Sequence, residues 1–147
     1  MPPTIALAEL PVAQRRAQAV VRAVVAVPGV RHALLSPVVA RPGYWVATAA
    51  GWGWGGILSR RLPRESHGVY VARGCPAWAF GRGGTTLGAV YLTRDNDAPE
   101  VLEHEAVHRA QWRRYGLAFI VLYLAAGADA LHNRFEIAAG LEKGGYR

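Results

Sequence analysis

The sequence has only one cysteine, Cys75, and only one lysine, Lys143. A single cysteine excludes an intramolecular disulfide and cannot hold an iron–sulfur cluster. No apolar run reaches the ~18 residues that a membrane span needs, and residues 43–58, which come closest, are interrupted by glycine. The start of the chain also lacks the basic flank, apolar core and small-residue cleavage site of a secretory signal. We therefore expect a cytoplasmic protein, with peripheral membrane contact as an option.

The composition favours one folded domain. About half of the 147 residues are apolar (52%), which argues against a disordered linker, and the length fits a single domain with a core of its own. We divide this domain, residues 1–147, into an N-terminal helical segment (1–35), a Gly- and Trp-rich segment (36–66) and a core (67–147).

The net charge of +7 comes almost wholly from arginine. A basic chain can attract nucleic acid or an anionic membrane, but charge alone indicates neither fold nor chemistry. The arginines are scattered, and no aromatic–basic motif of a known nucleic-acid module is present. Nucleic acid is therefore not an expected partner, although a basic adaptor for a membrane surface or nucleic acid stays an alternative function.

Residues 10–27 have the periodicity of an amphipathic helix that ends at "PG", residues 28 and 29. We expect the helix either to dock on the core or to make a basic amphipathic contact with a membrane. The predicted polar face consists of Gln14, Arg15, Gln18 and Arg22, and the predicted apolar face of Ala13, Ala17, Val20, Val24 and Val27.

Further along, the segment "GWGWGG" (51–56) is a weak match to a phosphate-binding loop, because no Lys and Ser/Thr follow it. We instead expect its glycines to let the two tryptophans, Trp52 and Trp54, pack beside a close backbone approach. Alternating apolar residues predict strands at 68–74 and 85–93. The helical periodicity of the residues that follow predicts helices over 98–115, 117–126 and 134–143. We expect Asp97 with Glu100 to cap the first of these helices, and a flexible "GGYR" to follow the last. Strands followed by helices indicate the α+β class.

The segment "HEAVH" (104–108) carries the chemistry. His104 and His108 are one helical turn apart and project side by side, which suits two ligands of one tetrahedral zinc. Glu105 lies between them, where it could take a proton from a zinc-bound water. Val101, Trp112 and Tyr115 extend the same stripe, so we expect this face to be buried.

A catalytic zinc needs a third protein ligand and an open fourth position. Glu136 on the 134–143 helix is the predicted third ligand, and His132 is the alternative. Asn133 and Glu136 also match a capping box, in which the carboxylate would close the helix start rather than bind metal. A fourth ligand from His132 would instead give a closed, structural site.

"HEAVH" followed by a helix-borne glutamate in "NRFEIAAG" resembles the gluzincin branch of the zincin metallopeptidases. Residues 83–146 also resemble a family of small uncharacterised actinobacterial proteins. The resemblance implies a zincin-like core with a small sheet, an edge strand lining the cleft, the helix bearing His104, Glu105 and His108, and a ligand helix carrying Glu136. One departure is that Gly140 stands where gluzincins often have an aspartate that orients a histidine.

The function that follows is a zinc-dependent hydrolase, a small metallopeptidase acting on a peptide or protein substrate. Zn²⁺ would activate a water, Glu105 would act as general base, and the 85–93 strand would hold the substrate by strand addition. Tyr123, His132 and Tyr146 are candidate donors to the oxyanion. The alternative is a binding protein with a vestigial zinc site and no turnover.

Overall fold

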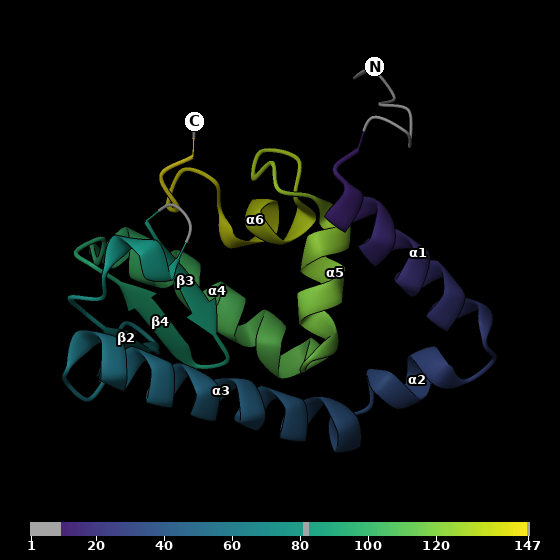
Figure 1. Cartoon of the computed structure of the whole chain (residues 1–147), viewed down its shortest axis with the longest axis horizontal. Helices are drawn as coiled ribbons and strands as arrows, with labels where there is room; N and C mark the ends of the chain where they lie inside the picture. Colours follow the sequence, from purple (N-terminus) through teal and green to yellow (C-terminus); the bar gives the residue numbers. More distant parts are fainter. Residues whose placement is uncertain (1–9, 81–82, 147) are drawn as a thin grey trace.

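The computed structural model describes residues 10–80 and 83–146 (Figure 1). Within them it contains six α-helices and a four-stranded sheet, so the α+β class is confirmed. The elements are α1 (Val12–Ala26), α2 (Val30–Leu34), α3 (Pro37–Ser59), β1 (Arg64–Ser66), β2 (Val69–Ala72), a 3-10 turn (Ala77–Ala79), β3 (Gly84–Leu87), β4 (Val90–Thr93), α4 (Pro99–Tyr115), α5 (Ala118–Ala126) and α6 (Arg134–Ala139). Among these helices, none is both long and apolar enough to cross a bilayer.

The sheet is small and mixed, with the strand order β1-β2-β4-β3. β2 and β4 run parallel, while β1 and β3 pair antiparallel with their neighbours, so β3 forms one edge. Successive side chains of β4 point to opposite faces. Val90 and Leu92 lie in one apolar cluster with Ala72, and Tyr91 lies in another with Val101 of α4.

Helices cover both faces of this sheet. α3 contacts β2, β3 and β4 on one side, and α4 packs on the other through Val101 and Leu102. In Figure 1, α3 runs along the edge of the molecule below the sheet, whereas α6 lies on the opposite side. The layer order therefore places α4 and its histidines away from the outer surface of α3.

α3 is an element that the sequence did not predict, because the 36–66 segment shows weak periodicity and contains several glycines. Each glycine costs a helix interior about 1 kcal/mol relative to alanine. Here the glycines allow close packing instead. A Cβ added to Gly51 would lie 2.8 Å from Val90 Cβ, and one added to Gly55 would lie 2.8 Å from Ala72 Cβ. The expected close backbone approach is therefore confirmed, and burial against the sheet offsets the low helix propensity.

The prediction of one strand at 85–93 was wrong. The chain turns at Gly88, which has a φ of 60°, and forms the β3–β4 hairpin. Thr48 of α3 fixes this turn because its Oγ1 accepts a hydrogen bond from Ala89 N at 3.0 Å. The sequence hides the hairpin because only two residues, Gly88 and Ala89, separate the two strands.

α1 forms as expected but presents a different face to the core. It packs along α5, with Ala17 buried and the Gln18 amide donating to the Ala125 carbonyl at 3.1 Å. Val20 and Val27, predicted to face inward, are exposed. The prediction of the buried face was therefore wrong in these positions, because α1 turns Ala17 and Gln18 toward α5.

The strand 68–74 and the three C-terminal helices agree with β2, α4, α5 and α6. Asp97 does not cap α4, which begins after Ala98 without a side-chain cap; Asp97 is ion-paired with Arg73 instead. α6 ends at Ala139, earlier than predicted, because Gly140 adopts a φ of 93° that stops the helix.

Candidate metal centre

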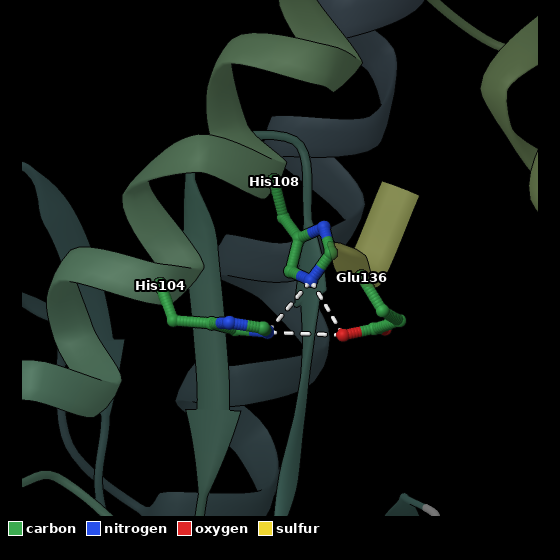
Figure 2. A group of neighbouring side chains, drawn as sticks. All are labelled: His104, His108 and Glu136. Carbon is green, nitrogen blue, oxygen red and sulfur yellow. Dashed lines mark hydrogen bonds and ion pairs between the residues drawn. The ribbon is translucent and has the colours of Figure 1, made fainter. Parts of the chain in front are cut away.

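His104, His108 and Glu136 converge on one point (Figure 2). His104 Nε2 lies 3.1 Å from His108 Nε2 and 3.0 Å from Glu136 Oε2, and His108 Nε2 lies 3.3 Å from the same oxygen. A tetrahedral zinc with bonds of 2.0–2.1 Å separates its donor atoms by roughly 3.3 Å. The triangle therefore has the size of one face of a tetrahedral zinc site.

Backbone and amide groups fix where the imidazole protons lie. His104 Nδ1 is 2.9 Å from the Gly140 carbonyl, which can only accept, so Nδ1 carries the proton. His108 Nδ1 is 2.8 Å from Gln111 Oε1, and the same amide donates through Nε2 to the Phe135 carbonyl at 3.0 Å. That second bond fixes the amide orientation, so His108 Nδ1 is also a donor. In the neutral imidazoles, both Nε2 atoms are then lone-pair acceptors.

Three acceptors consequently face one another in a buried place. His104 and Glu136 are nearly inaccessible, and His108 is also buried. Such a group needs a cation between its members, because buried acceptors without a donor are costly. Protonating both imidazoles would set two N–H groups against each other across 3.1 Å. One proton or one metal ion therefore satisfies the cluster.

The charges favour holding a cation there. Burial would raise the pKa of Glu136, but its contacts with His104, His108 and the Tyr123 hydroxyl outweigh burial and lower this pKa, so the carboxylate stays ionised. Burial would lower the pKa of His108, yet Glu136 and Glu105 outweigh this effect and raise it. The two carboxylates therefore favour a positive charge at His108.

The structure separates the two candidate third ligands. Glu136 is buried beside the histidines, while the His132 side chain is 75% exposed and pairs with Asp129 at 2.6 Å. The start of α6 is capped by Asn133, whose side chain accepts from Phe135 N at 2.9 Å. The capping box does not form with Glu136, whose second oxygen accepts from the Tyr123 hydroxyl. The carboxylate is therefore directed to the cluster.

Glu105 lies close enough to interact electrostatically with both histidines, without joining the triangle. Its Oε2 accepts from Thr86 Oγ1 at 2.7 Å, and the Thr86 carbonyl accepts from Trp112 Nε1 at 2.8 Å. Burial raises the pKa of Glu105, although the hydrogen bond from Thr86 and the charge of His108 partly oppose the shift. A carboxylate with a raised pKa is suited to accepting a proton near neutral pH.

The C-terminal residues complete the wall around His104. The Gly140 carbonyl accepts a hydrogen bond from its Nδ1 at 2.9 Å. Gly144 lies so close that an added Cβ would be 2.6 Å from His104 Cε1, and the Tyr146 ring centre is 6.0 Å from that of His104. Within the "GGYR" tail that was expected to be flexible, Gly144 and Tyr146 therefore pack on the imidazole, and Arg147 lies outside the described residues.

A cavity of about 560 Å³ opens beside the cluster. Glu105, His108 and Glu136 reach its wall, and the edge strand β3 (Gly84–Leu87) forms one side. The rest is mostly apolar and comes from α1, α4, α5 and the C-terminus: Pro11, Ala13, Gln14, Trp112, Phe119, Ile120, Tyr123, Leu124, Gly127, Ala128 and Tyr146. The cluster is thus accessible from a space bordered by an edge strand.

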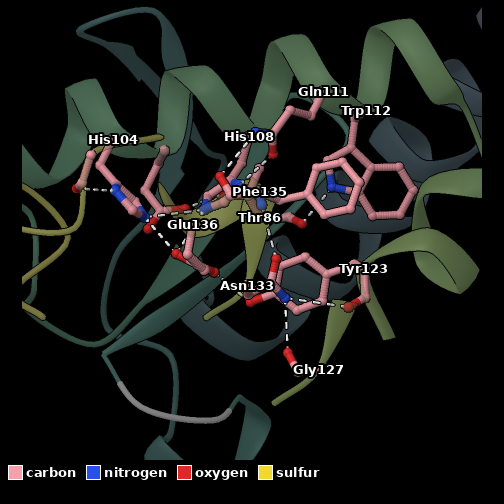
Figure 3. Close-up of polar contacts among 12 residues, drawn as sticks. Thr86, His104, His108, Gln111, Trp112, Tyr123, Gly127, Asn133, Phe135 and Glu136 are labelled. Carbon is pink, nitrogen blue, oxygen red and sulfur yellow. Dashed lines mark hydrogen bonds and ion pairs between the residues drawn. The ribbon is translucent and has the colours of Figure 1, made fainter. Parts of the chain in front are cut away.

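Sequence reasoning missed two residues that position the cluster, Gln111 and Thr86 (Figure 3). Gln111 is three residues past His108, a spacing that places both side chains on one helix face and could have indicated the contact. Thr86 gave no signal, because its contact with Glu105 depends on how the sheet lies against α4.

Comparison of the chain with protein-family models, curated proteins and solved structures finds no match. The functional argument therefore depends on the site itself.

Proposed function

We propose that this protein is a zinc-dependent metallopeptidase of the gluzincin type with a zincin-like core. The observation that carries the proposal is the convergence of His104 Nε2, His108 Nε2 and Glu136 Oε2 within 3.0–3.3 Å, with both imidazole Nδ1 protons already bound elsewhere. Two imidazoles and a carboxylate are the donor set of catalytic zinc sites that keep one position open.

The number of ligand side chains in the cluster supports a catalytic site rather than a closed structural site. Among residues 10–80 and 83–146, three side chains of metal-binding type form the group, and His132 is directed to solvent with Asp129. A bound zinc would supply a water of near-neutral pKa and polarise a carbonyl in the remaining position. Glu105, on the wall of the same cavity, would take the proton from that water and pass it to the leaving amine.

The edge strand supports a peptide substrate. β3 pairs with β4 on one side and borders the cavity on the other. An extended peptide could add to this edge through main-chain hydrogen bonds, which would hold its carbonyl beside Glu105. Of the three candidate oxyanion donors, Tyr123 and Tyr146 both line the cavity, whereas His132 is exposed.

The test begins with metal content. Protein purified without chelators should contain about one zinc per chain, and a different metal, or none after incubation with zinc at neutral pH, would contradict the proposal. Glu105→Gln should then keep the zinc and abolish peptide hydrolysis, because it removes the base and no ligand. Thr93→Ser serves as a matched control, since it is a conservative change on a neighbouring strand outside the cavity wall. Zinc binding without cleavage of any member of a broad peptide library would favour the vestigial-site alternative.

A further inference from the structure

The outer face of α3 is a continuous apolar surface. The helix buries one side against the sheet, and its exposed residues between 38 and 57 are Val38, Val39, Arg41, Pro42, Trp45, Val46, Ala49, Ala50, Gly53, Trp54 and Ile57. Only one of them is charged. Trp45 is 61% exposed and Ile57 is 71% exposed, so both side chains present most of their surface to solvent. Trp54 also contacts Trp78, with ring centres 6.3 Å apart, which extends the face beyond the helix.

The net positive charge of the protein lies in the N-terminal part of the chain, which includes α3. Residues 10–64, which include α1, α2 and α3, contain eight arginines and no aspartate or glutamate. Residues 65–147 contain nine basic and nine acidic residues and are therefore neutral overall. Arg41 lies near the start of the α3 face, and the exposed Arg60 and Arg61 follow its end. The charge is thus complementary to an anionic surface.

The position of α3 leaves the candidate metal centre accessible. α3 covers one face of the sheet, and α4, which bears the histidines, covers the other. In Figure 1, α3 lies along the lower edge, on the opposite side of the sheet from α6. A surface bound to the outer face of α3 would not cover Glu136.

We propose that the outer face of α3 binds an anionic lipid bilayer, with the helix lying in the plane of the interface. At 1.5 Å per residue the helix is about 34 Å long, yet it is not apolar enough to cross a bilayer. Tryptophan partitions to the membrane–water interface, and arginine beside it pairs with anionic headgroups. The face carries both residue types and no acidic one.

A second copy of the chain is a poorer occupant of this face. Two copies meeting through α3 would bring their arginine-bearing segments together, and like charges repel. A protein partner with an acidic rim would meet the same charge requirement, so the experiment must distinguish the partner from the lipid.

The experiment is vesicle co-sedimentation of the full chain. Vesicles of phosphatidylcholine alone are compared with vesicles containing about one third phosphatidylglycerol. Binding should require the anionic lipid and weaken with added salt, since exposed charges are screened. The double variant Trp45→Ser/Ile57→Ser should weaken binding on the order of tenfold or more, because both side chains would lose their insertion into the interface.

Two matched controls keep the test specific. Leu131→Ser/Ile137→Ser removes two exposed apolar side chains elsewhere and should bind as wild type does. Arg60→Gln/Arg61→Gln should weaken binding about 25-fold, at about fivefold per arginine, whereas Arg113→Gln/Arg114→Gln on α4 should change it little. Circular dichroism checks that each variant is folded.

Several outcomes would overturn the proposal. These are wild-type protein that stays in the supernatant with anionic vesicles, binding that is equal on both vesicle types, and α3 variants that bind as wild type does. Light scattering that finds a dimer which the Trp45→Ser/Ile57→Ser variant dissociates would assign the face to a second copy instead.

Discussion

Replacing Gln111 tests whether the cluster is held as the structure indicates. Gln111→Leu removes the acceptor for His108 Nδ1–H and the donor to the Phe135 carbonyl. Outer partners of metal-bound histidines typically contribute 10–100-fold in metal affinity, so zinc binding should weaken by about 1.4–2.7 kcal/mol. The metal-free protein should also lose about 1–3 kcal/mol of stability, because the buried Phe135 carbonyl loses its donor.

A second substitution separates the two effects. Gln111→Glu keeps an acceptor for His108 but cannot donate to Phe135, so it should keep zinc affinity and still lower the stability of the metal-free protein. Gln18→Leu is the matched control, since it removes an amide–carbonyl bond between α1 and α5 far from the cluster. It should cost stability alone.

The assay is titration of each variant against a competing zinc chelator, with chemical unfolding in excess chelator for the metal-free stability. If Gln111→Leu binds zinc as tightly as wild type, the assigned proton positions are wrong. If Gln111→Glu and Gln111→Leu weaken zinc equally, the loss comes from the disturbed helix contact rather than from His108.

Three further predictions concern the same cluster. Gly144→Ala should weaken zinc binding by about tenfold or more without changing a ligand, because the added Cβ displaces the His104 ring. The control is Gly53→Ala, where nothing lies within 4 Å of the added Cβ. If both variants bind zinc equally tightly, the contact between Gly144 and His104 is contradicted. Glu136→Ala should weaken zinc binding by orders of magnitude and His132→Ala should change it little, as chelator competition would measure; the reverse result would reassign the third ligand. As the pH is lowered, zinc affinity should begin to fall above pH 6.5, the ordinary pKa of histidine, because protons compete with zinc for His108 and the pKa of His108 is raised. A titration in which zinc affinity falls only below pH 6.5 would contradict the raised pKa.

The sequence by itself determined the local parts of the site. The one-turn spacing of His104 and His108 makes them neighbours on any helix, and the periodicity of residues 98–115 predicts that helix. The apolar stripe with Val101 and Trp112 predicts which face is buried. These features depend on residues a few positions apart, so local geometry suffices to infer them.

Only the tertiary structure decided the contacts that join distant segments. Asn133 takes over the cap and Tyr123 binds Glu136, which directs that carboxylate to the histidines rather than to its own helix start. A backbone carbonyl at Gly140 orients His104, and no residue type signals a carbonyl.

α3 was hidden for a related reason. Its glycines lower helix propensity when considered locally, and they become favourable only where Gly51 and Gly55 approach the strands of the sheet. The helix exists because packing outweighs propensity, and packing depends on which surfaces meet. The same packing leaves Trp45 and Ile57 on the outside, so the exposed apolar face follows from the fold and could not be recognised from the order of the residues alone.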